Sequence, residues 1–296
     1  MPWPHTQPTR TPDVLIVANL GLGRAFQANA WLYLRAARAL VERVAAWDLA
    51  ERALDLDDPP RARLVLLLDK DASTAEALRS TGATVINAPE AILACDDKRR
   101  TAALLAAAGV ATPRTVLLPP LYPKQPLGDA TLREVVRTLG LPVVVKEAKG
   151  SFGAQVHLAE TYDDLVAIAS TLADRRLLAQ TFVASSAGRD RRLQVVDGEV
   201  VAAMERRAIG DFRANLSAGG VGYPYLPSAK ERTLAIEAAR AVGARNAGID
   251  LLLDEGGEGS LVCEVNSNAH IWRLTALSGI DVAYQVLRRL LRGQGR

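Results

Sequence analysis

The sequence has few cysteines and no long apolar run, and each shortage excludes a class of protein. The 2 cysteines, Cys95 and Cys263, lie far apart and each follows apolar residues, which favours reduced structural thiols and disfavours a zinc site. No apolar stretch reaches the roughly 20 residues that span a membrane. The N-terminal segment lacks the apolar core of a signal peptide. We therefore expect a cytoplasmic protein with no membrane partner.

Basic charge is not concentrated in one place. The formal net charge is +3 at pH 7, and the basic residues are dispersed, whereas a nucleic-acid-binding protein more often shows one basic stripe. We therefore expect no nucleic-acid partner.

The 296 residues are 49% hydrophobic and 23% charged, which is typical of a globular protein of two or three domains.

Common nucleotide-binding motifs are missing or incomplete. The GLG stretch at residues 21–23 lacks the third glycine of a dinucleotide loop, because Phe26 stands in its place. No Gly-Lys-Ser/Thr of a Walker A loop follows the later glycine turn, and the HRD and DFG motifs of protein kinases do not occur. The sequence therefore disfavours these nucleotide-binding classes.

The first ninety residues alternate between strand and helix patterns. Apolar runs at residues 14–20, 63–69 and 83–87 predict strands, and the apolar spacing over residues 24–47 predicts a helix. This alternation is typical of a parallel α/β layer.

The rest of the chain mixes helices with hairpins. Asp96 and Asp97 are candidate N-caps of an alanine-rich helix that ends at Gly109, and Asp197-Gly198 is a hairpin turn signal. Two β-runs in residues 142–160 are joined by a turn that contains glycine. Further helices are predicted at residues 129–139, 162–172, 228–242 and 280–291.

A polar pattern stands out in the stretch LVCEVNSNAH, residues 261–270. Glu264, Asn266 and Asn268 alternate, so they point to one face of a strand. If the preceding turn centres on Gly257, Asp250 lies opposite Glu264, and such facing carboxylates are destabilising unless a cation lies between them. Two carboxylates and an amide oxygen suit Mg²⁺. The alternative is a solvent-facing hairpin edge with chance acids.

A phosphate-binding Mg²⁺ site also needs positive charge and close backbone approach. The turn KGSFGAQ follows the strand that carries Lys146, and its glycines allow backbone N–H groups to approach phosphate oxygens. An ordinary hairpin is the alternative. Lys98, Arg192 and Arg213 are scattered in the sequence, and each alone is typical of a surface charge.

Four stretches carry a family resemblance: VVVKEAKGSFGAQV, GRDRRLQVVDGEVVAAMERRAIGDFRANLSAGG, AGIDLLL and LVCEVNSNAH. In this order they resemble the ATP-grasp ligases of the RimK-like α-L-glutamate ligase family, from about Asn87 to Ala283. The resemblance implies an α/β and α+β chain with the ATP-grasp fold. It divides the chain into a pre-ATP-grasp α/β domain (1–94), a small lid domain (95–183) and a C-terminal domain that carries the metal site (184–296).

The resemblance also implies an ATP site. It assigns Lys98 and Lys146 to the phosphates, Gly150, Ser151, Phe152 and Gly153 to the loop that covers them, Gln180, Thr181 and Phe182 to the adenine hinge, and Asp190 and Arg192 to the rest of the nucleotide. It assigns Asp250, Glu264 and Asn266 to Mg²⁺, commonly two ions, with Mn²⁺ as a substitute. The metal set expected from the hairpin and the set implied by the family are the same three residues.

The implied reaction joins a carboxylate to an amine through an acyl-phosphate, with ADP as a product. Arg213 and Asn215 resemble the residues beside the γ-phosphate and the acyl-phosphate. The implied substrates are ATP, an amino acid such as L-glutamate, and a peptide, protein or small-molecule acceptor. Alternatives are an ADP-forming ligase that joins small amino acids and a non-catalytic ATP-binding module. A homo-oligomer is compatible with the sequence.

One segment departs from the family pattern. Many relatives continue the Glu-x-Asn strand with Ser-Pro-Gly, whereas this chain continues with SNAHIW. His270 is expected near the acceptor, where two interpretations stay open. It either deprotonates the attacking amine or packs as a hydrogen-bonded histidine behind the site.

Overall fold

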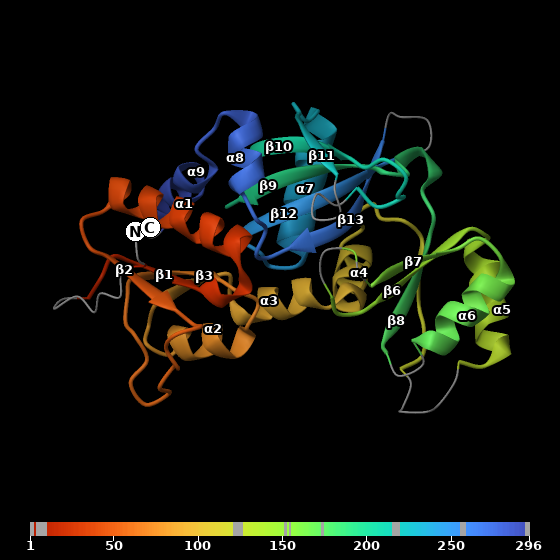
Figure 1. Ribbon diagram of the computed structural model, residues 1–296, viewed down its shortest axis with the longest axis horizontal. Coiled ribbons are helices and arrows are strands. Elements are labelled where there is room, and N and C mark those ends of the chain that lie inside the picture. The colour runs from red at the N-terminus through yellow and green to blue at the C-terminus, as the bar shows by residue number, and fades with distance from the viewer. Residues whose placement is uncertain are drawn as a thin grey trace.

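The computed structural model describes residue 3 and residues 11–120, 127–150, 153, 155–172, 175–214, 220–254 and 259–293. Its strands form three sheets that follow one another along the chain. The first and second sheets lie towards opposite ends of the molecule, and the third lies between them (Figure 1). No helix in the described ranges combines the length and apolarity that crossing a bilayer requires.

The first sheet is parallel, with the order β2–β1–β3–β4. Its strands are β1 (Val14–Ala18), β2 (Val44–Asp48), β3 (Leu64–Leu68) and β4 (Thr84–Ile86). The short helix η1 (Leu20–Leu22) follows β1. One face packs against α1 (Arg24–Leu40), and the other packs against α2 (Ala72–Arg79) and α3 (Pro89–Asp96). Strands covered on both faces are continuous apolar runs, and β1 and β3 are buried throughout.

The helix predicted over residues 24–47 is too long. Helix α1 ends at Leu40, and Val41 is already extended with φ −142°. Residues 44–48 instead form the edge strand β2, which pairs in parallel with β1. Strand pairing buries Ala45, Ala46 and Trp47 together, whereas a helix would bury one stripe only.

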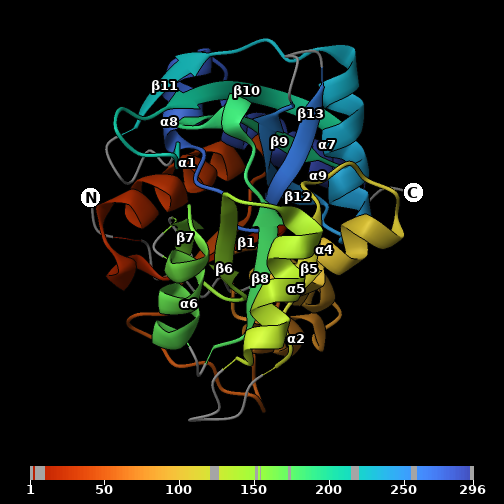
Figure 2. The same ribbon diagram turned by 90° about the vertical axis from the view of Figure 1, so that its right-hand side faces the viewer.

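The second sheet is antiparallel, with the order β5–β8–β6–β7. Its strands are β5 (Thr115–Leu117), β6 (Val143–Glu147), β7 (Val156–Ala159) and β8 (Leu177–Thr181). Helices α5 (Asp129–Leu139) and α6 (Tyr162–Thr171) cover one face (Figure 2). Helix α4 (Lys98–Ala107) precedes the sheet, and the predicted cap Asp97 accepts from the backbone N–H groups of Arg99 and Arg100.

The third sheet has the order β11–β10–β9–β12–β13. Its elements are η2 (Ala184–Ser186), β9 (Arg189–Val196), β10 (Glu199–Arg207), β11 (Val221–Pro224), β12 (Asn246–Leu253) and β13 (Ser260–Asn266). Helix α7 (Ala229–Ala241) covers one face, and α8 (Trp272–Ser278) and α9 (Val282–Arg292) pack on the other. The predicted hairpin between β9 and β10 is confirmed, and its turn residues Asp197 and Gly198 have φ of 44° and 78°.

The first and third sheets share a core. Helices α8 and α9 pack against α1, so apolar residues of the first sheet and of β9 and β10 belong to one cluster. Asn87, which follows β4, adds a polar link. Its Oδ1 accepts from the backbone N–H groups of Arg245 and Asn246, and its Nδ2 donates to the carbonyls of Asn246 and Ser267. The proposed boundary between residues 94 and 95 lies inside α3.

Candidate active site

Two cavities meet at the edge of the third sheet. The first, called the cleft, has a volume of about 110 Å³ and lies between the second and third sheets. The second, called the side cavity, has a volume of about 530 Å³ and lies against α1, the end of β3 and α8. Asp250 and Glu264 line both.

The structure gathers most of the sequence-predicted residues in the cleft. These are Lys98, Lys146, Gly150, Gly153, Gln180, Thr181, Phe182, Asp190, Arg213, Asp250 and Glu264. Arg192, Asn266 and His270 line the side cavity and are not among the residues of the cleft. The predicted residues Ser151, Phe152 and Asn215 lie outside the described residues.

The two lysines bring buried positive charge into the cleft. Lys98 is the first residue of α4; its Nζ donates to the carbonyl of Gly150 at 2.7 Å and lies 3.8 Å from Oε1 of Glu264. Burial lowers the pKa of Lys98, and the nearby Glu264 carboxylate partly offsets this. Lys146 on β6 is 8% exposed. Ammonium groups in such a site are stabilised by an anionic ligand.

Arg213 connects the third sheet with the glycine turn. Its guanidinium donates to the carbonyl of Gly153 at 2.7 Å and forms an ion pair with Asp211 at 2.8 Å. The hydrogen bond from Arg213 lowers the pKa of the Asp211 carboxyl. Gly150 and Gly153 have φ of 136° and 76°, a backbone conformation that glycine adopts without strain.

The far end of the cleft is suited to a flat ring. Gln180 on β8 donates to Oγ1 of Thr115 at 2.9 Å, and its buried Oε1 has no hydrogen-bond partner within the described ranges. The rings of Phe182 and Phe212 meet edge to face with centroids 6.2 Å apart. Free hydrogen-bonding capacity beside an aromatic wall fits a heterocyclic base.

The predicted pairing of Asp250 with Glu264 is confirmed, but a bulge changes the strand around it. The register runs from Asp250–Glu264 to Leu251–Val262, so Cys263 is an extra residue. Strict alternation predicts that Cys263 faces the core. The bulge instead places both Cys263 and Glu264 on the cleft, where Lys146 Nζ lies 3.7 Å from the Cys263 sulfur.

A buried chain of alternating charges supports Asp250. Arg192 donates through Nε and Nη2 to the two carboxylate oxygens of Asp250. Arg206 donates to Asp190 at 2.6 Å through each of Nε and Nη2, and its Nη2 lies 3.0 Å from Asp250. Burial alone would raise the pKa of Asp250, but the two guanidinium groups hold it below its ordinary value. Asp250 is therefore ionised at neutral pH.

The donor set fits a hard divalent cation. Asp250 and Glu264 face each other, and the Asn266 amide lies 3.4 Å from Asp250. Carboxylate and amide oxygens are ligands of Mg²⁺, which also retains waters. Among the described residues no group of three His, Cys, Asp or Glu side chains could hold a metal, so the amide of Asn266 is needed to complete the set.

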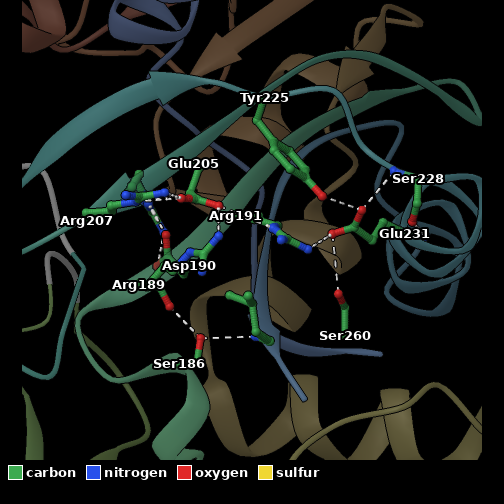
Figure 3. Close-up of polar contacts among 12 residues, drawn as sticks. Ser186, Arg189, Asp190, Arg191, Glu205, Arg207, Tyr225, Ser228, Glu231 and Ser260 are labelled. Carbon is green, nitrogen blue, oxygen red and sulfur yellow. Dashed lines mark hydrogen bonds and ion pairs between the residues drawn. The ribbon is translucent and has the colours of Figure 1, made fainter. Parts of the chain in front are cut away.

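A second ion-pair network joins β9 and β10 to α7 (Figure 3). Glu205 pairs with Arg189 at 2.7 Å and Arg207 at 2.6 Å, and Arg191 pairs with Glu231 at 2.7 Å. Glu231 also accepts from Tyr225 and from the backbone N–H of Ser228, the N-cap of α7. The network holds β9 in place. The alternate residues Asp190 and Arg192 of this strand line the cleft and the side cavity.

Sequence reasoning missed Arg206, Cys263 and Arg189 as residues of the two cavities. Arg189 lines the cleft and Arg206 lines the side cavity. The sequence does show acidic and basic residues on both strands of the predicted hairpin, and this is the feature that points to Arg206. Counting from the turn alone would have placed Glu205, not Arg206, opposite Asp190, because a register shift between Val200 and Ala202 was not visible.

Comparisons with known proteins place the chain in one family. A family model described as a RimK-like ATP-grasp domain matches residues 95–290. An uncharacterized MG012 homolog from Mycoplasma pneumoniae is 34% identical over 236 residues, covering 77% of this chain and 80% of that protein. The ribosomal protein bS6–L-glutamate ligase of Escherichia fergusonii is 35% identical over 214 residues, covering 71% and 68%.

Solved structures show the same fold. The ATP-grasp ligase PsnB complexed with a minimal precursor superposes with a TM-score of 0.72 at 18% identity, covering 96% of this chain and 99% of that one. The predicted ATP-grasp fold is thus confirmed.

Proposed function

This chain belongs to the RimK-like ATP-grasp family, and we propose that it is an ATP-dependent, ADP-forming ligase that joins a carboxylate to an amine. The observation that carries the proposal is the junction of the two cavities at Asp250 and Glu264. A phosphate chain that passes the buried lysines of the cleft would end at these acids. A substrate in the side cavity would then face the terminal phosphate.

Different residues of the cleft bind different parts of ATP. Lys98 and Lys146 bind phosphate oxygens, and the turn with Gly150 and Gly153 covers them. Asp250, Glu264 and Asn266 would hold Mg²⁺, which when bound neutralises phosphate charge; we infer two ions, with Mn²⁺ as a substitute. Residues 180–182 form the adenine hinge, and Asp190 lies on the ribose side.

Arg213 acts on the reacting groups, together with Asn215, which lies outside the described residues. A carboxylate oxygen attacks the γ-phosphorus, the bond to ADP breaks, and an acyl-phosphate forms. An amine then attacks the acyl carbon, phosphate leaves, and the nitrogen loses a proton. Arg213 stabilises the charge that develops on the transferred oxygens.

The side cavity is the site for the carboxylate and the amine. Its volume of about 530 Å³ lies in the usual range of small-ligand sites, so it would hold an amino acid and the end of an acceptor. The relatives named as L-glutamate ligases favour L-glutamate as the added amino acid and a peptide, protein or small molecule as the acceptor. A ligase that joins two small amino acids is the second candidate on the same observation.

His270 is held neutral on the wall of this cavity. Burial lowers its pKa to about 4, with further lowering by Arg192 and Lys70, and its ring meets Phe26 edge to face at 4.4 Å. Such a weak base is poorly matched to an ammonium group. We therefore favour a packed residue that orients the amine over a general base.

Product analysis tests the function. Purified protein is incubated with ATP, Mg²⁺ and a panel of carboxylates, each with L-glutamate, glycine or hydroxylamine as the amine. We expect ADP and phosphate in equal amounts, with an amide or hydroxamate as the second product. AMP and pyrophosphate as the stoichiometric products would contradict the proposal. A cytoplasmic location and self-association are further expectations, tested by fractionation and light scattering.

A further inference from the structure

We infer that Arg192 and the metal ion compete for Asp250, and that Arg192, once displaced, binds the carboxylate of the substrate in the side cavity. This inference rests on the proposed function and adds a second partner for Arg192. The sequence resemblance assigns Arg192 to the nucleotide, whereas its side chain lines the side cavity.

Asp250 has little hydrogen-bonding capacity left for a metal ion. Its two oxygens accept from Arg192 Nε and Nη2, from Arg206 at 3.0 Å and from Asn266 at 3.4 Å. A carboxylate offers about four lone-pair sites. A metal ion that takes Asp250 as a ligand must therefore displace at least one of these donors. Asn266 makes the longest of the four contacts and leaves Asp250 when its amide oxygen turns to the metal, so the metal charge then meets the two guanidinium groups on the same carboxylate.

Of the two cations that contact Asp250, Arg192 has more freedom to leave. Arg206 is 5% exposed and also holds Asp190 with two bonds of 2.6 Å, so its departure would leave a buried carboxylate unpaired. Arg192 has Asp250 as its acidic partner within the described ranges. When Arg192 leaves Asp250, the metal takes its place on the carboxylate. The guanidinium of Arg192 is then available to another ligand.

The local backbone is shaped for the side chain of Arg192. Gly248 lies beneath it on β12, and a Cβ at Gly248 would come within 2.5 Å of Ala269 Cβ, 3.0 Å of Arg192 Nη1 and 3.1 Å of Arg192 Cδ. The absence of a side chain there lets Arg192 cross the strand. From this position the guanidinium can turn into the side cavity, whose wall also carries Lys70 and Arg273.

The displaced guanidinium would favour a carboxylate ligand. Its planar pair of donors matches a carboxylate, and two parallel hydrogen bonds also fix orientation. Metal binding at Asp250 would then strengthen the binding of the acidic substrate. Because linkage is reciprocal, the acidic substrate would strengthen metal binding to the same degree.

The test compares Arg192→Gln, Arg192→Lys and wild type, with Arg207→Gln as the control. Arg207 lies next to Arg206 but its side chain is 54% exposed and pairs with Glu205 on the other face. Mn²⁺ is titrated into protein saturated with ADP, and free Mn²⁺ is measured by electron paramagnetic resonance. KM is measured separately for ATP and for the carboxylate substrate.

Removal of the competing charge should tighten Mn²⁺ binding in Arg192→Gln by about tenfold, within the usual range of coupling between sites. KM for the carboxylate should rise about tenfold or more, and KM for ATP should stay near wild type. Arg192→Lys keeps the charge, so it should bind Mn²⁺ like wild type yet bind the carboxylate more weakly. Arg207→Gln should match wild type in all three measurements.

Unchanged or weaker Mn²⁺ binding in folded Arg192→Gln would overturn the inference, because a merely structural role predicts that result. Wild-type protein that binds no Mn²⁺ with ADP, or releases no ADP with any carboxylate, would instead overturn the proposed function. Thermal unfolding of each variant shows that the comparison is made between folded proteins.

Discussion

The ammonium nitrogen of Lys146 lies 3.7 Å from the sulfur of Cys263, although the two residues belong to different sheets on either side of the cleft. The bulge at Cys263 makes this approach possible, because strict alternation would turn the thiol away. Burial raises the pKa of Cys263, and the Lys146 charge opposes part of that rise. The thiol is therefore neutral at physiological pH and lies where a nucleotide would cover it.

Labelling of Cys263 tests this placement. In a Cys95→Ser background, N-ethylmaleimide should modify Cys263 slowly, because the thiolate is scarce. Addition of ADP and Mg²⁺ should slow the labelling several-fold further, as measured by mass spectrometry. An equal labelling rate with and without ADP would place Cys263 outside the nucleotide site.

Glu264→Gln tests the metal site. The substitution keeps the size of the side chain and removes one charged ligand, so turnover should fall roughly 10²-fold or more. The free energy of unfolding should change little, because the Lys98–Glu264 pair is long at 3.8 Å and Arg192 and Arg206 already compensate Asp250. The exposed Glu237→Gln on α7 is the control. Wild-type turnover at ordinary Mg²⁺ would remove Glu264 from the ligand set.

Arg213→Ala and Gly153→Val should separate chemistry from binding. Removal of the Arg213 charge should lower kcat by about 10²–10³-fold with a smaller loss of ATP affinity. Gly153 has φ 76°, so a valine there strains the turn and hinders its closure over the phosphates. ATP affinity should therefore fall in Gly153→Val.

The measurements are ATP affinity by calorimetry and ADP release at saturating ATP. Gly128→Val is the matched glycine control, because Gly128 has φ −67° and open space around its Cα. Arg133→Ala on the exposed face of α5 is the arginine control. An Arg213→Ala variant that loses ATP binding but keeps normal single-turnover chemistry would contradict this role. Arg213 would then only bind the phosphate of ATP before the reaction.

The pKa of His270 predicts a pH dependence of stability. The folded protein holds this pKa at about 4, below the ordinary value of 6.5. Between these two values the unfolded chain binds a proton that the folded chain does not, so stability falls as the pH drops from 6.5 towards 4. His270→Gln should lose less stability than wild type between pH 7 and pH 5, as measured by urea unfolding. Equal losses would show that His270 titrates normally in the folded protein.

The sequence by itself determined the parts of the fold that depend on local pattern. Turn residues such as Asp197 and Gly198 have backbone preferences that require no distant partner, and the cap at Asp97 acts on its own helix. The hairpin pattern also placed Asp250 and Glu264 on adjacent strands, whereas their direct pairing depends on the bulge at Cys263.

Tertiary structure decided what depends on register and on neighbours. Residues 44–48 form a strand because β1 offers an edge to pair with, and no local pattern records that edge. The bulges near Ala202 and at Cys263 shift the register by one residue, which places Arg206 opposite Asp190 and brings Cys263 into the cleft. Since adjacent strand residues point to opposite faces, a shift of one residue exchanges core and site. Strand register likewise places Arg192 over Gly248 and opposite Asp250, and its side chain lines the side cavity.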